Sequence, residues 1–298
     1  MTLRAAGTTD RRTGWALAAA GILFVSLDAY FVRLADAPGA TTAFLMACGS
    51  VVTLGLGALV GSGGPAGVVR RTAGHRRSLL VLAGLSAATQ AAFVIAVTRT
   101  SVANVVVIVA AAPLVAAVIG RVVLGERPSR PVAVGIALSA IGVAIVTSGS
   151  IGAPTLDGDL VALVAIVCFA TSIVLWRRAP DLDRPVTLAS GSVMMAVGLL
   201  PFVDWGAIDT RAVLAAGTMG AVTNPIGRLL YSAAPRFAPA AEVAMFAPVE
   251  TVAATAWVWV AFDESPSMRT VIGGIVVLIA LAGVTMTGTT PGRSGQST

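Results

Sequence analysis

Lysine is absent from this chain of 298 residues, which contains only one histidine and two cysteines. A phosphate-binding P-loop needs a lysine after its glycines, so the glycine-rich stretch at residues 61–67 cannot be one. A single histidine, His75, cannot form a histidine-rich metal site. Cys48 and Cys168 lie midway along apolar runs, where inert buried thiols are usual. The sequence therefore predicts that the protein binds no cofactor and no metal and is not an enzyme.

Charged residues are also scarce, at 11% of the chain against 56% hydrophobic residues, whereas a soluble domain has about 25% charged residues. A helix that crosses a bilayer needs about 20 apolar residues. We therefore expect one all-α polytopic membrane domain with ten transmembrane helices. They are predicted at residues 14–34, 40–61, 78–98, 101–120, 131–149, 159–176, 186–203, 212–234, 239–261 and 269–288.

All the basic residues are arginines, and their distribution among the loops predicts the topology. With the N-terminus inside, fifteen arginines fall in inner segments and four in outer segments, and Arg228 falls inside a helix. Positively charged short loops stay on the cytoplasmic side. We expect both termini in the cytoplasm, in a membrane of the bacterial inner type. The arginines are spread over short loops and form no continuous stripe, so no nucleic-acid partner is expected.

A polar motif occurs twice between apolar runs, as LGERPSRPVAVG at residues 124–135 and as FDESPSMRTVIGG at residues 262–274. A shift of 138 positions aligns the glutamates and prolines of the two copies, which are Glu126 with Glu264 and Pro128 with Pro266. Each copy then contains five helices, and duplication of an odd number inverts the second copy in the membrane. The sequence predicts two inverted repeats, residues 1–149 and 150–298, an arrangement typical of secondary transporters.

The motifs LGERPS after the fourth predicted helix and VWVAFDESPS after the ninth resemble those of the drug/metabolite transporter superfamily, EamA type. The resemblance covers roughly residues 14–288. It implies a carrier, often an exporter of amino acids or other small metabolites, with a central cavity lined by helices one to four and six to nine. The sequence departs from the common family pattern at Thr251 and Asp263.

Four polar residues are predicted deep in the membrane: Asp28, Gln90, Asn224 and Glu250. A charged side chain at bilayer depth costs about 2.5–3.5 kcal/mol even on insertion scales, so it needs a partner, water or a function. Asp28 and Glu250 are candidates for carboxylates that take up a proton and hold the ammonium group of a substrate. The alternative is a structural role, in which Ser26 and Tyr30 would satisfy Asp28. The amides suit a zwitterionic ligand or interhelical hydrogen bonds equally well.

Arg228 and Glu242 are predicted at similar depth near the cytoplasmic end, and a structural ion pair between them is our preferred interpretation. A gate or a clamp for a substrate carboxylate is the alternative. Pro113, Pro225 and Pro248 fall inside predicted helices, where each removes a backbone hydrogen bond. They are candidate hinges, although proline kinks without a function are also tolerated.

Tryptophans at predicted helix ends are interpreted as interface anchors: Trp15, Trp176 and Trp205. Deeper aromatic residues are candidates for lining an amphipathic cavity, with packing against helices or lipid as the alternative: Phe93, Tyr231, Phe246 and Trp257. Small residues in the fifth predicted helix form a close-packing stripe: Gly135, Ser139 and Gly142.

These observations predict a secondary active transporter that exports small amphipathic metabolites, such as neutral or aromatic amino acids, by alternating access. Its partners would be the small-molecule substrate, the lipid bilayer and, if transport is coupled, protons. Multidrug efflux or uptake of other small solutes is the alternative within transport. A channel or a receptor-like scaffold is the alternative outside it.

Overall fold

A computed structural model describes residues 8–99, 108–109, 111–148, 156–262 and 268–287, and every regular element in these ranges is helical. The first half of the chain contains α1 (Thr8–Ser26), α2 (Asp28–Ala35), α3 (Gly39–Ser62), α4 (Pro65–Thr72), α5 (Arg76–Arg99), α7 (Ala112–Leu124) and α8 (Arg130–Thr147). The second half contains α9 (Leu156–Arg178), α10 (Arg184–Leu199), α11 (Thr210–Thr218), the π-helical turn η3 (Met219–Thr223), α12 (Asn224–Ala233), α13 (Ala240–Ala244), α14 (Ala247–Phe262) and α15 (Met268–Thr287). Three 3-10 turns connect some of these helices: η1 (Leu200–Phe202), η2 (Trp205–Ala207) and η4 (Ala234–Arg236).

The helices form a polytopic membrane bundle. Five helical stretches are long and apolar enough to cross a bilayer: Asp10–Ala35, Gly39–Ser62, Asp157–Arg178, Arg184–Phe202 and Ala240–Ala261. Three shorter apolar helices accompany them: Ala112–Leu124, Arg130–Ile145 and Val271–Met286. Large apolar side chains such as Val60, Val122 and Val260 are 79–82% exposed, as expected for a surface that lipid covers. The all-helical membrane fold is confirmed, whereas the number of ten helices stays a prediction.

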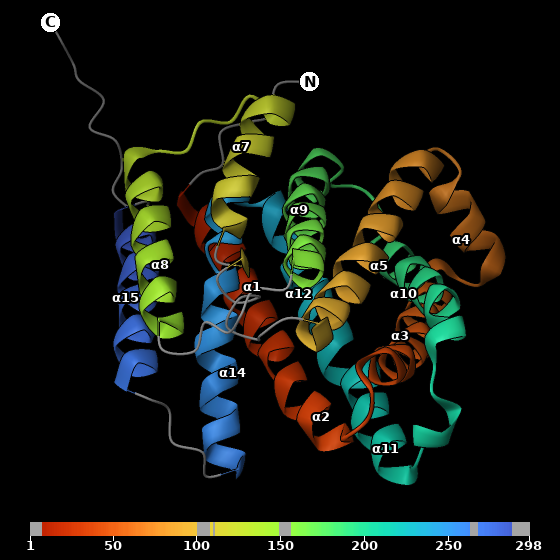
Figure 1. Cartoon of the computed structure of the whole chain (residues 1–298). Helices are drawn as coiled ribbons and strands as arrows, with labels where there is room; N and C mark the ends of the chain where they lie inside the picture. Colours follow the sequence, from red (N-terminus) through yellow and green to blue (C-terminus); the bar gives the residue numbers. More distant parts are fainter. Residues whose placement is uncertain (1–7, 100–107, 110, 149–155, 263–267, 288–298) are drawn as a thin grey trace, which may run out of the picture.

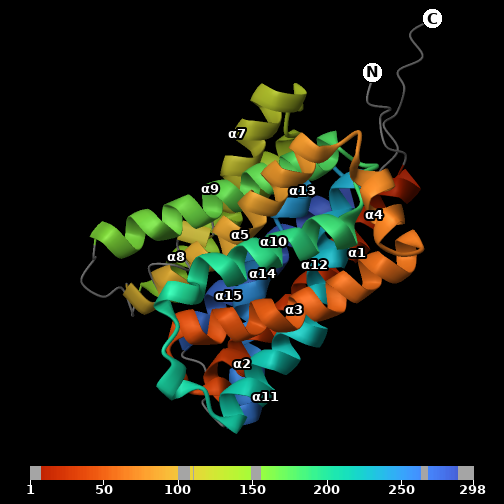
Figure 2. The ribbon, with the colours of Figure 1, turned by 90° about the vertical axis from the view of Figure 1, so that its right-hand side faces the viewer.

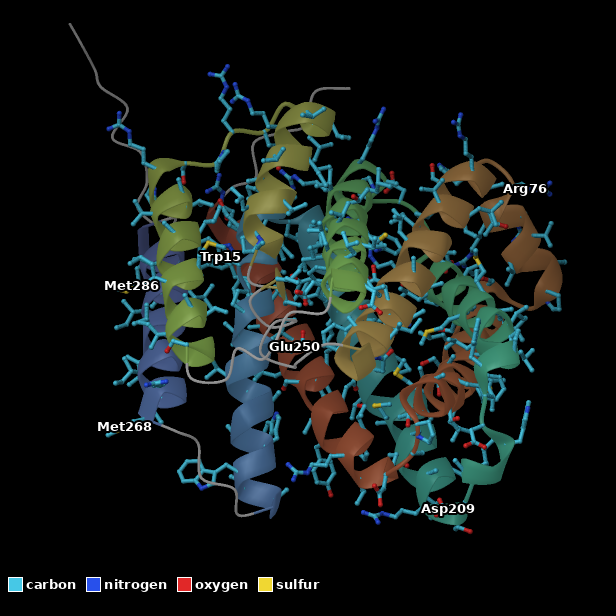
Figure 3. All side chains as sticks on the ribbon, viewed as in Figure 1. Trp15, Arg76, Asp209, Glu250, Met268 and Met286 are labelled. Atoms are coloured by element: carbon cyan, nitrogen blue, oxygen red, sulfur yellow. The ribbon has the colours of Figure 1, made fainter. Side chains whose placement is uncertain are left out.

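The two ends of the bundle differ in charge. The starts of α1 and α5, the ends of α7 and α9 and the short helix α4 lie at one end (Figure 1). These segments carry Arg11, Arg71, Arg76, Arg121 and Arg177, and we name this end the arginine-rich end. The labelled residues Asp209 and Met268 lie at the opposite end (Figure 3).

Packing between the two halves follows a two-fold pattern, which is clearest when helices are numbered by predicted span. The fifth span packs on the tenth (α8 on α15) and the second on the seventh (α3 on α10), so each pairs with its equivalent. The third packs on the sixth (α5 on α9), and the mirrored pair, the eighth on the first, is present as α12 on α1. Figure 1 shows α8 beside α15 at one edge of the molecule, and Figure 2 shows α5 along α9 and α3 along α10. An internal two-fold axis would produce these pairings.

The predicted small-residue stripe is confirmed at the contact between α8 and α15. A Cβ atom added at Gly142 would stand 2.8 Å from the carbonyl oxygen of Gly273, and one at Gly135 would stand 2.4 Å from a methyl group of Val284. Ser139 is 1% exposed. The two backbones therefore approach so closely that larger residues would separate the helices.

Candidate functional site

Three of the predicted spans depart from the regular α-helix at one point each, while the chain stays helical on both sides. The predicted helix 14–34 is divided at Leu27 into α1 and α2, and the π-helical turn η3 separates α11 from α12. Met245 and Phe246 form a turn between α13 and α14. Irregular backbone at membrane depth is tolerated only where protein or a water-filled cavity surrounds it, and transporters build substrate sites from such broken helices. The three irregular points therefore indicate where a substrate site would lie.

The three predicted hinge prolines lie at helix starts: Pro225 and Pro248 in the irregular eighth and ninth spans, and Pro113 in the fourth span. Pro113, Pro225 and Pro248 are the second residues of α7, α12 and α14. Proline fits the first turn of a helix because the backbone N–H groups there have no intrahelical acceptor. The prolines thus occupy unstrained positions after an interruption, and movement about them stays a prediction.

Asp28, the first residue of α2, lies against the π-helical turn. Its carboxylate accepts hydrogen bonds from the Asn224 side-chain nitrogen at 2.7 Å and from the Thr223 hydroxyl at 3.2 Å. Ser26, which the alternative structural interpretation offered as a partner of Asp28, instead donates to the Leu23 carbonyl at 2.8 Å and accepts from Trp257 at 2.9 Å. The break in the first span and the π-turn of the eighth therefore meet at this carboxylate.

Arg228 lies one helical turn after Asn224 on α12 and links three helices. Its guanidinium donates to the Ser86 hydroxyl on α5, to the Ser192 hydroxyl on α10 at 3.4 Å and to the Asn224 side-chain oxygen at 3.5 Å. These acceptors are neutral, and the nearby charge that stabilises the cation is Asp28. Since a guanidinium carries five N–H donors, Arg228 retains donors for a ligand.

The predicted ion pair between Arg228 and Glu242 is wrong. Glu242 is 4% exposed and instead accepts from Arg11 at 3.2 Å and from the Trp15 indole nitrogen at 3.0 Å. The prediction compared only depth along the membrane normal, and two residues at one depth can face different neighbours. Trp15 is also no interface anchor, because it is 7% exposed.

The other two predicted anchors differ from each other. Trp176 is also buried, at 5% exposure, and its ring lies 5.5 Å from the Arg184 guanidinium carbon. Trp205 is 61% exposed at the opposite end, as an interface anchor would be.

Glu250, in the first turn of α14, has no hydrogen bond or ion pair to the described part of the chain. It lies within electrostatic reach of Asp28, and α14 packs on α2. In Figure 3, Glu250 is about midway between the end with Arg76 and the end with Asp209. We name Asp28, Glu250 and Arg228, with Asn224 and Thr223, the central cluster. With all three ionisable groups charged, the cluster carries one excess negative charge.

The remaining predicted ligands are only partly near this cluster. Gln90 lies one turn from Ser86 on α5, and its side-chain oxygen is buried without a partner among the described residues. Tyr231 is within electrostatic reach of Glu250, but its hydroxyl donates to the Val243 carbonyl at 2.9 Å. Phe246 is 4% exposed and lines a hollow of about 380 Å³ beside Trp15, and Phe93 is 39% exposed. The structure thus assembles Asp28, Asn224 and Glu250 with Arg228, and of the predicted aromatic residues it brings Tyr231 and Trp257 near this cluster.

The comparison with protein families decides what this architecture belongs to. The sequence matches the EamA-like transporter family twice, over residues 12–148 and over residues 156–286. The chain belongs to the EamA-like transporter family. This confirms the resemblance to the drug/metabolite transporter superfamily and makes the protein a transporter of that type in a membrane. The boundary between the two matches falls between α8 and α9.

Solved structures support the fold of this EamA-like protein. One crystal structure matches with a TM-score of 0.77 over 95% of this chain and 99% of the other, at 16% identity. A likeness at that identity concerns the fold alone. The comparison with curated proteins gives no match.

The motif residue Glu126 of this EamA-like protein has a structural position that the sequence did not predict. Its carboxylate accepts from the Arg177 guanidinium and, at 3.3 Å, from the backbone N–H of Ala240 at the start of α13. Pro128 lies beside it in the connection between α7 and α8. The second copy, with Glu264 and Pro266, lies outside the described residues.

Sequence analysis missed Ser86, Ser192 and Thr223, which hold the charged groups of the central cluster. Hydroxyl residues are common in apolar helices, so each alone gives no signal. The spacing of Ser86 and Gln90, four residues apart on one helix face, was the available indication. Among the described residues, no group of three or more His, Cys, Asp or Glu side chains is placed to hold a metal ion.

Proposed function

We propose that this EamA-like transporter is a ten-helix carrier of two inverted halves, residues 1–149 and 150–298, that works by alternating access. Two observations support this proposal. The packing between the halves pairs helices as a two-fold axis would, and the family matches each half separately. In such carriers the substrate binds at the midplane, where the repeats meet. The arginine-rich end, at which α1 begins and α15 ends (Figure 1), faces the cytoplasm of a cell with a bacterial-type inner membrane.

The central cluster carries the proposal for the substrate. The broken helices bring two carboxylates and one guanidinium together, and Glu250 has no polar partner in the described chain. An unpaired charge is costly at membrane depth, so Glu250 favours a ligand group that carries a positive charge. An ammonium group does so at Glu250, and the free donors of Arg228 suit a substrate carboxylate. A neutral or aromatic amino acid carries both groups.

A proton is the second species that can neutralise one of these carboxylates. A proton and an ammonium group compete for the same carboxylates, so proton uptake from outside releases the substrate and loss of the proton to the cytoplasm restores the site. This exchange couples export of the amino acid to proton entry. The residues that would carry it are Glu250 and Asp28, with Gln90 available to accept from the bound ammonium group.

Counterflow in proteoliposomes tests the proposal. Vesicles loaded with unlabelled neutral or aromatic amino acids should accumulate the labelled amino acid through the parent protein. The variant Glu250→Gln should lose most of this exchange, whereas the matched control Asp181→Asn, at an exposed acid, should keep it. If no neutral or aromatic amino acid exchanges through the parent, the substrate class is wrong.

The excess negative charge also favours a second candidate, the efflux of amphipathic organic cations that lack a carboxylate. The two candidates differ in their need for Arg228. Replacement Arg228→Gln should reduce amino-acid exchange strongly, because the carboxylate loses its partner. The same change should preserve or raise the exchange of an organic cation, because it removes a repelling charge. Assays of both solute classes, in both directions of transport, separate the candidates and distinguish export from uptake.

A further inference from the structure

The short helix α13 lies between the central cluster and the arginine-rich end. All residues from Ala240 to Pro248 are buried, although a helix at the surface of a membrane bundle would expose one face to lipid. The elements around α13 are α1, α7, α9 and η4. Glu250 follows on the far side of the break at Met245 and Phe246. A solute that moves along the inner face of α14 from Glu250 towards the arginine-rich end would pass α13.

Two sets of hydrogen bonds hold α13, and both cross from one half of the chain to the other. Glu242 of α13 is bound by Arg11 at 3.2 Å and by Trp15 at 3.0 Å, both from α1. The backbone N–H of Ala240 donates to Glu126 at 3.3 Å. Residues of the first half therefore bind α13 at the Glu242 side chain and at the backbone N–H of Ala240.

Arg177, near the end of α9, forms hydrogen bonds to the same region. Its guanidinium binds Glu126 and also donates to the carbonyl oxygens of Pro235 at 2.9 Å and Ala238 at 3.0 Å, in the segment that leads into α13. Arg177 and Glu126 are 11% and 21% exposed at their side chains. One guanidinium therefore joins the motif between α7 and α8 to the approach of α13.

We propose that α13 is the cytoplasmic gate of the carrier, and that the Glu242 and Glu126 contacts are the latch that holds it closed. This inference rests on the proposed function. Buried ion pairs are close to energetic balance because desolvation offsets their attraction, so such contacts can separate during a transport cycle. In this proposal α13 bends relative to α14 at the turn of Met245 and Phe246, which already interrupts the regular helix. A hollow of about 70 Å³, lined by residues that include Ala116, Glu126 and Glu242, marks where the gate would open.

Access of a water-soluble thiol reagent tests the gate without any substrate. In a background with Cys48→Ser and Cys168→Ser, the change Ala116→Cys places one thiol behind the latch, where Ala116 is 0% exposed. A membrane-impermeant maleimide is applied to the cytoplasmic face of inside-out vesicles. With the latch intact, labelling should be slow. Adding Glu242→Gln should raise the labelling rate about tenfold or more, a shift of about 1.4 kcal/mol in the gate equilibrium.

Controls separate gating from general loosening. The change Asp181→Asn breaks another ion pair at the same end, with Arg236 at 3.9 Å, but both residues belong to the second half, so labelling should not change. The change His75→Cys, at an exposed position in the turn between α4 and α5 at the arginine-rich end, should react quickly in every background. The milder change Trp15→Phe removes one hydrogen bond from the latch and should raise labelling by a smaller factor, which covers the case that Glu242→Gln does not fold.

The proposal is overturned if labelling at position 116 is equally fast with the latch intact, or unchanged in whichever of the two latch variants folds. It is also overturned if Asp181→Asn raises labelling as much as Glu242→Gln does. The outcome is independent of the substrate assay. Faster labelling together with absent amino-acid exchange would refute the substrate class and leave the gate in place, whereas unchanged labelling with intact exchange would refute the gate alone.

Discussion

The hydrogen bond between Asp28 and Asn224 should be one of the strongest polar contacts in the interior. It joins a carboxyl acceptor to an amide donor at 2.7 Å, and the Thr223 hydroxyl adds a second bond at 3.2 Å. Hydrogen bonds to charged groups contribute about 1.5–3 kcal/mol each. The change Asp28→Asn keeps one acceptor oxygen but removes the charge that faces Arg228. We expect it to lower the free energy of unfolding by about 2–3 kcal/mol.

The exchange of the two side chains gives a sharper test than either single change. Asn224→Asp alone would place two carboxylates in contact and should destabilise the protein at least as much. In the double variant Asp28→Asn with Asn224→Asp, the amide again donates to a carboxylate. The carboxylate now lies directly beside Arg228, whose guanidinium nitrogen is 3.5 Å from the Asn224 oxygen. The double variant should recover most of the loss, with a coupling energy of about 2–3 kcal/mol.

Chemical unfolding of the purified parent, both single variants and the double variant in the same mixed micelles measures this coupling. The variant Thr53→Val is a useful reference. The Thr53 hydroxyl donates to the carbonyl of Ala221 in η3 at 2.7 Å, and neither group is charged. Its loss should cost only about 1 kcal/mol. A coupling below about 0.5 kcal/mol would show that the two positions behave independently. The described contact would then have no energetic role.

Three further predictions follow from named contacts. Glu250→Gln should flatten the pH dependence of transport with little change in membrane abundance, measured by exchange assays across pH and by quantitative blotting; a profile equal to that of the parent would remove its coupling role. Gly220→Ala should destabilise the fold by about 1–3 kcal/mol, because its Cβ would lie 2.0 Å from a carbonyl oxygen of α3, whereas Gly217→Ala, with no neighbour within 4 Å, should be neutral or stabilising in the same thermal-unfolding assay. Trp257→Phe should cost about 1 kcal/mol through loss of its 2.9 Å bond to Ser26, and the combination with Ser26→Ala should cost little more if that bond accounts for the effect.

Much of the fold could be predicted because membrane insertion imposes a strong constraint on sequence. Apolar runs and arginine-bearing loops predicted where helices lie and which ends share a side. The glycine spacing in α8 predicted a close helix contact, which α15 provides. The interruptions within the helices were harder to predict from the sequence. Asp28 at membrane depth was visible in the sequence, but apolar residues such as Leu27 and Met245 give no local signal that a helix stops there.

The residue types of the candidate site could be predicted from the sequence, but the contact partner of each residue could not. Depth counting along a helix gives the height of a side chain but not the direction in which it points. It therefore paired Arg228 with Glu242, whereas the partner of Glu242 is Arg11, which we had interpreted only as a topology signal. Asp28 and Asn224 were both predicted as polar residues near the midplane, and their contact required the relative rotation of α2 and α12, which only packing determines.

The contact between α8 and α15 restricts how the two halves can move. Near Gly142 a Cβ atom would stand 2.8 Å from the main chain of Gly273 and 2.9 Å from a methyl group of the stiff, branched Val277, so the contact leaves little room for sliding. The motion of α8 relative to α15 should then be limited to a change of their crossing angle. Displacements should then grow with distance from this edge of the molecule, so spectroscopic labels placed on α8 would provide a stationary reference for motions measured elsewhere.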